Sequence, residues 1–221
     1  MKKIVLAALL TGVSGAAFAA DLPQRTFAPA AAVYAPTPFS WTGVYVGANA
    51  GYAYGVFPTA GKIDSFANPS GGEIGGTVGY NYQYGHFVFG GEGELGYNNL
   101  KATQTVATGT TKASVGWMAT ERLRAGFAVD RALLYVTGGL AQADVEGQFA
   151  NKAGIGKTQK GWRTGGVIGG GVEYALTNNV SLKAEYLYAP LQSKQYFPTS
   201  KAYINTALDL SLFRVGVNYK F

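Results

Sequence analysis

The 221-residue chain contains no cysteine, a single histidine and, after its N-terminal segment, no apolar run of about 18 residues. Without cysteine there is no disulfide framework and no thiol chemistry. His86, in an expected tight turn, cannot by itself supply a Ser/His/Asp triad or a histidine-rich metal site. The missing apolar run excludes a transmembrane helix. The sequence therefore predicts a protein that is not an enzyme and binds no cofactor or metal.

Charge is also sparse. Charged residues make up 14% of the sequence, and the formal net charge of +6 includes Lys2 and Lys3 of the N-terminal segment. A mature chain this mildly basic gives no reason to expect nucleic-acid binding. Glycine is abundant instead, with 32 residues, and each glycine inside a helix costs about 1 kcal/mol relative to alanine. The composition therefore predicts a single all-β domain.

The N-terminus has the three parts of a secretory signal peptide. Lys2-Lys3 form a basic region, residues 4–13 an apolar region too short to span a bilayer, and Ala17-Phe18-Ala19 a small-x-small site. Cleavage is predicted after Ala19, so that residues 1–19 are removed on export.

An extended linker is predicted at residues 20–40, because this segment is rich in alanine and proline and shows no strand or helix periodicity. The folded domain then occupies residues 41–221, in which apolar and polar residues alternate with period two. The alternating segments are residues 41–54, 72–83, 87–97, 114–128, 133–143, 162–175, 180–188 and 207–221. They predict about eight strands, each close to the roughly 10 residues that a tilted membrane strand needs.

The connections between these segments are expected to alternate in length. Those near residues 84, 130 and 178 are short, whereas those at residues 55–71, 98–112, 144–161 and 189–206 are long and polar. Bacterial outer-membrane barrels have this asymmetry, with short periplasmic turns and long extracellular loops.

The last segment shows the alternation most clearly. One face carries Phe213, Val215, Val217, Tyr219 and Phe221, and the other carries Arg214, Gly216, Asn218 and Lys220. A soluble, lipocalin-like barrel would bury the apolar face, whereas a membrane barrel turns that face toward lipid. The signal peptide, the terminal phenylalanine and the aromatic residues at strand ends favour lipid outside. We therefore predict an eight-stranded antiparallel transmembrane β-barrel, closed by pairing of the last segment with the first.

With lipid outside, the charged residues of the polar faces line a narrow lumen. They are five acidic and five basic residues: Glu73, Glu92, Glu94, Arg122, Arg124, Glu173, Lys183, Glu185, Arg214 and Lys220. Buried charges need partners, so this balanced set predicts a salt-bridge network. Eight strands enclose a lumen that side chains can just fill, which favours a structural network over the alternatives of a conducting pore or an ion path.

The fourth segment contains one exception to the pattern. Val115, Trp117 and Leu123 are expected to face lipid, but Glu121 falls on the same face. An acidic residue there costs less than the roughly 2 to 4 kcal/mol of an arginine or lysine at the bilayer midplane. Turning Glu121 inward would turn Arg122 outward, so we keep the register and expect a protein contact or a shallow position at Glu121.

Several stretches resemble a known family. They are Phe39-Ser40-Trp41-Thr42-Gly43-Val44-Tyr45-Val46-Gly47, Phe87-Val88-Phe89-Gly90-Gly91-Glu92-Gly93-Glu94-Leu95, Leu134-Tyr135-Val136-Thr137-Gly138-Gly139-Leu140-Ala141, Gly171-Val172-Glu173-Tyr174-Ala175-Leu176 and Leu182-Lys183-Ala184-Glu185-Tyr186-Leu187-Tyr188. Together with the terminal phenylalanine they are similar to the small 25/31-kilodalton outer-membrane proteins of alphaproteobacteria, within the OmpA-like barrels. The resemblance implies a Gram-negative outer-membrane surface antigen with a periplasmic linker. It also implies that Tyr219 and Phe221 are read by the outer-membrane assembly machinery.

The resemblance leaves the activity open, because similar proteins are described as porins, haem-binding proteins, adhesins or envelope-stabilising antigens. We predict a structural role in the envelope. A small porin-like channel and a loop-mediated receptor for haem or a host molecule are the alternatives. The predicted loops carry many cations: Lys62, Lys101, Lys112, Lys152, Lys157, Lys160, Arg163, Lys194 and Lys201. Outer-membrane lipids and lipopolysaccharide, with their phosphates, are therefore expected partners.

Overall fold

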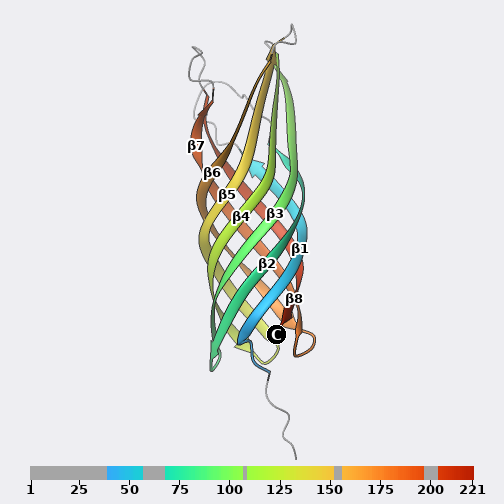
Figure 1. Cartoon of the computed structure of the whole chain (residues 1–221), viewed down its shortest axis with the longest axis vertical. Helices are drawn as coiled ribbons and strands as arrows, with labels where there is room; N and C mark the ends of the chain where they lie inside the picture. Colours follow the sequence, from blue (N-terminus) through green and yellow to red (C-terminus); the bar gives the residue numbers. More distant parts are fainter. Residues whose placement is uncertain (1–38, 57–67, 107–108, 152–155, 197–203) are drawn as a thin grey trace, which may run out of the picture. The chain divides into compact units, whose positions relative to one another are not determined.

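The computed structural model describes residues 39–56, 68–106, 109–151, 156–196 and 204–221, which form eight strands joined into one closed antiparallel barrel (Figure 1). The strands are β1 (Gly43–Val56), β2 (Ser70–Tyr84), β3 (Phe87–Val106), β4 (Gly109–Val129), β5 (Ala132–Asn151), β6 (Gly156–Ala175), β7 (Val180–Tyr196) and β8 (Ile204–Lys220). Each pairs with its neighbour in sequence, and β8 closes the sheet against β1. The predicted fold class is confirmed. Among the described residues no helix is both long and apolar enough to cross a membrane.

The outer wall of the barrel is apolar because successive side chains of a strand point to opposite faces. In β8, Val215 is 65% exposed on the outside, whereas its neighbour Arg214 is 4% exposed and points into the lumen. The same alternation runs through all eight strands, which leaves many large apolar side chains on the outer surface. Burial of the polar face and exposure of the apolar face is the arrangement expected of a wall that meets lipid.

The predicted signal peptide and most of the predicted linker lie outside the described residues. The described chain begins with Phe39, whose ring meets the Trp41 ring edge-on at 5.1 Å between centroids. Trp41 is only 2% exposed, and its backbone N–H donates to Gln83 Oε1 at 2.7 Å. The described residues before β1, 39–42, therefore pack into the turn end of the barrel.

Three connections are short, as the sequence predicts. They join Tyr84 to Phe87, Val129 to Ala132 and Ala175 to Val180. In the first of them Gly85 has a φ of 59°, in the left-handed region that glycine enters without a steric penalty. The barrel's C-terminus lies at this end, which we call the turn end (Figure 1).

The prediction of long polar loops at residues 98–112, 144–161 and 189–206 is wrong in large part, because strands occupy most of all three ranges. β3 continues to Val106 before β4 begins at Gly109, and β5 continues to Asn151. These hairpins reach well beyond the end of β1 (Figure 1). The sequence analysis missed these strand extensions because their outer faces carry lysine and threonine instead of apolar residues. The wall therefore continues past the roughly 10 residues that cross the membrane.

A shift of register corrects one predicted face. The pairing of β4 with β5 is irregular between Val115 and Met118, and the pairing of β3 with β4 shifts between Tyr97 and Leu100. Val115 is consequently 2% exposed inside the barrel, while Trp117 is 49% exposed outside. The prediction that both face lipid is wrong for Val115, because an extra residue in one strand reverses the faces beyond it.

The interior consists of three layers. At the turn end is a small apolar layer of Phe39, Trp41, Val88, Ala128, Leu133, Tyr135 and Ala175. Charged and polar side chains fill the middle. At the opposite end, which we call the loop end, lies an apolar plug of Ala53, Leu100, Val115, Met118, Ala141, Ala143, Val145, Val167, Leu187, Ala189, Leu191, Leu208, Leu210 and Leu212. The lumen is therefore mostly polar in its central part and mostly apolar on both sides of it, although Arg163, paired with Ala143 of the plug, is also buried at the loop end.

Candidate functional site

The middle layer of the lumen is a cluster of charged side chains that we call the charge belt. It consists of Glu73, Glu92, Glu94, Arg122, Arg124, Glu173, Lys183, Glu185 and Arg214. The structure thus brings together nine of the ten residues predicted to line the lumen. Each of these side chains is at most 5% exposed.

Strand pairing places opposite charges next to each other. Glu92 of β3 is in register with Arg122 of β4, Glu173 of β6 with Lys183 of β7, and Glu185 of β7 with Arg214 of β8. Residues directly opposite on neighbouring strands have Cβ atoms about 5 Å apart, within reach of long side chains. The register of neighbouring strands therefore places three pairs of oppositely charged belt residues directly opposite each other.

Arg122 and Arg214 then connect these pairs across the lumen. Arg122 Nη1 lies 3.1 Å from Glu185 Oε2, and its Nη2 lies 3.0 Å from Glu94 Oε2 and also contacts Glu92. Arg214 Nη2 donates to both Glu94 Oε2 and Glu185 Oε2 at 2.6 Å. Each guanidinium serves two or more carboxylates, which its planar array of donors permits.

A second group surrounds Arg124. Its Nη2 lies 2.8 Å from Glu173 Oε2, and its guanidinium carbon lies 4.1 Å from the centre of the Tyr135 ring. The other oxygen of Glu173 accepts hydrogen bonds from Ser181 and Asn218, at 2.5 Å and 2.7 Å.

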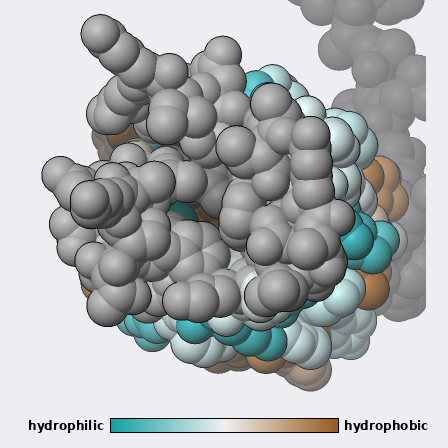
Figure 2. All heavy atoms as spheres, turned by 90° about the horizontal axis from the view of Figure 1, so that it is seen from above, coloured by the Kyte–Doolittle hydropathy of each residue, from teal (hydrophilic) through white to brown (hydrophobic). Residues whose placement is uncertain are grey.

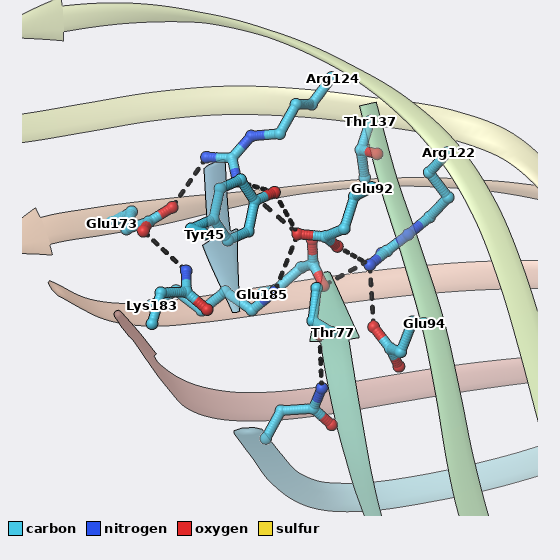
Figure 3. A network of polar contacts seen from close by, with 12 residues as sticks. Tyr45, Thr77, Glu92, Glu94, Arg122, Arg124, Thr137, Glu173, Lys183 and Glu185 are labelled. Carbon is cyan, nitrogen blue, oxygen red and sulfur yellow. Dashed lines mark hydrogen bonds and ion pairs between the residues drawn. The ribbon is translucent and has the colours of Figure 1, made fainter. Parts of the chain in front are cut away.

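Figure 3 shows Arg124 and Glu173 beside Tyr45 and Glu92. Lys183 Nζ lies 3.3 Å from Glu92 Oε2. Most charged groups of the belt thus have two or more partners, as burial requires. Glu73 differs, because its Oε1 lies 3.8 Å from Arg214 Nη1 and accepts no hydrogen bond from a described residue.

Two tyrosines belong to the belt although the sequence analysis did not assign them to it. Tyr45 Oη donates to Glu92 Oε2 at 2.8 Å, and Tyr135 Oη donates to Glu185 Oε1 at 3.0 Å. Both are 3% exposed. Their position on the polar face of their strands, opposite Val44 and Leu134, is the feature that could have identified them. With them, all eight strands contribute to the belt.

Lys220 is the predicted belt residue that the structure places elsewhere. Its Nζ contacts the carbonyl oxygen of Ser40 and lies 4.5 Å from the centre of the Phe39 ring. The expectation of an acidic partner is wrong for Lys220 because the side chain leaves the lumen at the turn end. The described belt therefore holds five carboxylates and four cations, with the two tyrosine hydroxyls as additional donors.

Arg163 is also displaced from its predicted place. It was expected in an external loop, but it lies in β6 and is 3% exposed. Lys101, Lys112 and Lys160 are exposed as expected, although they lie on strands instead of loops. The other predicted loop cations fall outside the residues whose side chains are described.

Little free space accompanies the belt at the turn end. A cavity bordered by Trp41, Tyr45 and Glu173 has a volume of about 10 Å³. This is about the space that a single water molecule requires.

His86, the single histidine of the chain, makes contacts within the barrel wall. His86 stacks on Phe127, and its Nδ1 lies 3.0 Å from the carbonyl oxygen of Ala128. Within the described ranges no group of three or more acidic, histidine or cysteine residues could hold a metal ion.

At the C-terminus, Tyr219 and Phe221 are 47% and 72% exposed on the outer wall, and the Phe221 N–H donates to Val44 O at 3.0 Å.

The chain is similar to known outer-membrane proteins in sequence. A family model described as the outer membrane protein beta-barrel domain matches residues 5–221. The 31 kDa outer-membrane immunogenic protein of Brucella melitensis is 34% identical over 250 residues, which cover 100% of both chains. The 22 kDa outer membrane protein of Rhizobium leguminosarum is 33% identical over 182 residues, which cover 82% of this chain and 79% of the relative.

The fold is also similar to a solved structure. The outer membrane protein OprG from Pseudomonas aeruginosa matches with a TM-score of 0.52 and 15% identity, covering 83% of this chain and 98% of that one. At this identity the likeness concerns the fold alone. These relatives and this structural neighbour are outer-membrane proteins by name, and none of the three is named as an enzyme.

Proposed function

Because the chain belongs to the outer-membrane β-barrel protein family and is a protein of the Gram-negative outer membrane, we propose that it is a non-enzymatic structural component of the envelope whose barrel is closed to solutes. The family resemblance inferred from the sequence is confirmed by the same matches. The narrower role is argued below from the interior of the barrel.

The observation that carries the proposal is the layering of the lumen. The charge belt lies between the apolar layer at the turn end and the apolar plug at the loop end. An ion that entered would have to leave water for apolar surroundings twice and break paired charges between them. Each of these steps costs several kcal/mol. The layering therefore favours a stabilising network over the porin-like channel.

The plug supports the same reading. Leu208, Leu210 and Leu212 are at most 1% exposed, although they lie on the inward face of β8 that also carries Arg214. Pores lined for ion passage present polar or charged side chains to the solute. A leucine row on the lumen face instead fills space and excludes water. The alternative of a haem or host receptor depends on loop residues outside the described ranges.

A second role, binding of lipid phosphates, is favoured by the outer face of the strand extensions. Lys101, Lys112 and Lys160 are exposed there, on β3, β4 and β6. Asp144 Oδ2 lies 2.9 Å from Lys160 Nζ, and this hydrogen bond raises the pKa of Lys160. Figure 2, which views the loop end, shows hydrophilic residues in teal among paler and some hydrophobic ones.

Aromatic side chains lie just below these lysines. The rings of Tyr97 and Trp117 meet edge-on with 5.4 Å between their centroids. Trp162, two residues from Lys160, is 54% exposed. Tryptophan and tyrosine prefer the membrane interface, which places the lysines at the level of the headgroups. Lysine binds phosphate as a point charge, so the phosphates of lipopolysaccharide are the partners we propose for this face.

The structural role is tested by deleting the gene and measuring both envelope integrity and solute uptake. The proposal predicts greater sensitivity to detergents with unchanged uptake of small solutes. Wild-type protein should restore resistance, and an Arg122→Ala variant should restore it less because its belt is broken. Slower solute uptake with unchanged detergent resistance would instead establish a transport role.

A further inference from the structure

Glu121 stands on the lipid-facing wall of the barrel. It is exposed on the outside of β4, and its neighbours in register are Gly93 of β3 and Leu140 of β5. Trp117 lies four residues toward the loop end and Phe127 six residues toward the turn end, both outside. At about 3.4 Å per residue along a tilted strand, Glu121 lies about 10 Å below the level of Trp117. This depth favours the protein contact over the shallow position, the two alternatives expected for Glu121.

The register of the charge belt fixes this position. Arg122 is the next residue, and it is held inside by Glu92, Glu94 and Glu185. Turning Glu121 into the lumen would expel Arg122 and leave three buried carboxylates short of a partner. The energetic demand of the belt therefore places a carboxyl group in lipid.

No partner for Glu121 lies on the described part of the same chain. No hydrogen bond or ion pair joins it to another described residue, and the described cations of the outer surface lie near the two ends of the barrel. A polar group in hydrocarbon without a partner is costly, and ionisable residues within membranes ordinarily face protein or water and pair with one another or with backbone carbonyls. The missing partner must come from another molecule.

The wall carries no side chain opposite Glu121 on the β3 side, whereas Leu140 lies opposite it on β5. Gly93 is directly opposite in β3, and a Cβ atom added there would have no neighbour within 4 Å. Gly91 and Gly138 lie one step along the same face, next to Leu123. Small residues on a lipid-facing surface let a second protein wall approach closely. We call Glu121, Gly91, Gly93 and Gly138 the glycine notch.

We propose that the glycine notch is the contact face of a homodimer in the outer membrane, in which the two Glu121 side chains hydrogen-bond to each other. Copies of one barrel insert in the same orientation, so a two-fold axis along the membrane normal places each residue at the depth of its counterpart. A carboxylic acid carries both a donor O–H and an acceptor oxygen, which makes two such groups complementary. A second copy therefore supplies the partner that the first chain lacks.

Cysteine crosslinking tests this directly, because the natural chain has no cysteine. Leu123 is 74% exposed beside Glu121, and Val215 is 65% exposed on β8 as a matched control. In native outer membranes under oxidation, Leu123→Cys should give a crosslinked dimer and Val215→Cys should not. Adding Glu121→Leu to Leu123→Cys should abolish the dimer. Equal crosslinking at both sites, or crosslinking that survives Glu121→Leu, would overturn the proposal.

The mass of the purified barrel in mild detergent gives a second readout that does not depend on disulfide geometry. Wild-type protein should be dimeric and Glu121→Leu monomeric, with both barrels folded. Glu121→Gln should remain dimeric, because an amide is also both donor and acceptor. A monomeric wild type, or a notch occupied by a different protein, would contradict the homodimer.

Discussion

Arg122 Nη1 lies 3.1 Å from Glu185 Oε2, although 63 residues separate them in the chain. The contact joins β4 to β7 across the lumen, so it links strands that share no backbone hydrogen bonds. Backbone pairing alone would hold each strand only to its two neighbours. The charge belt adds direct connections across the interior, and the following predictions concern those connections and the layers around them.

Replacing Arg122 by alanine is expected to destabilise the barrel by about 3 to 5 kcal/mol, because it leaves buried carboxylates without their partner. The free energy of unfolding in denaturant measures the change. Lys160→Ala is the matched control. Its ion pair with Asp144 has a lysine that is 62% exposed, and solvent screening makes such surface pairs contribute little to stability. Equal losses in the two variants would contradict the structural importance of the belt.

Leu210→Ala probes the apolar plug. Leu210 is 1% exposed, and removal of a buried leucine side chain costs about 2 to 5 kcal/mol. The same unfolding experiment on Val215→Ala serves as control, since Val215 is 65% exposed and lipid or detergent fills the space it leaves. The plug would be unimportant for stability if the two substitutions had the same effect.

Gly79→Ala tests the close approach of Tyr45 to β2. A Cβ atom at Gly79 would collide with the Tyr45 ring and its hydroxyl, which donates to Glu92. Overpacking of this kind costs about 1 to 3 kcal/mol. At Gly76 the nearest atom to an added Cβ is 3.9 Å away, so Gly76→Ala should be neutral. Identical unfolding midpoints for both variants would show that the Tyr45 ring is not fixed in its position and moves away from the added methyl group.

The proposed lipid-phosphate face predicts that replacing Lys101, Lys112 and Lys160 together by glutamine reduces the lipopolysaccharide retained on the purified barrel. Removing the charges leaves the wall and its aromatic residues in place, so folding should be unchanged. Native mass spectrometry counts the bound lipid. Retention equal to wild type, with the barrel folded, would show that these lysines do not hold the phosphates.

The sequence predicts much of the fold because period-two alternation and turn residues are local. The alternation places Arg122 and Arg214 on the polar faces of their strands, and the signal peptide and terminal aromatic residues, which favour lipid outside, turn those faces inward. The strand extensions were missed since Lys101 and Thr103 on their outer face look like loop residues. In water, as opposed to lipid, an outer wall has no need of apolar side chains.

The layers of the lumen were harder to predict for a different reason. Leu208, Leu210 and Leu212 lie on the same inward face of β8 as Arg214. The alternation predicts that these side chains point inward, but it does not predict that the lumen changes there from charged to apolar. The register shift near Val115 has no sequence signature, because a bulge depends on pairing with another strand. Lys220 was misplaced because alternation says nothing about where the lumen ends.

Conductance of the purified barrel in a planar lipid bilayer tests the central claim most directly. The sealed interior predicts no stable, reproducible open levels for the wild-type protein. Folding of the same sample is checked by its altered gel mobility before and after boiling. Reproducible open levels from folded wild-type barrels would contradict the account and favour the channel.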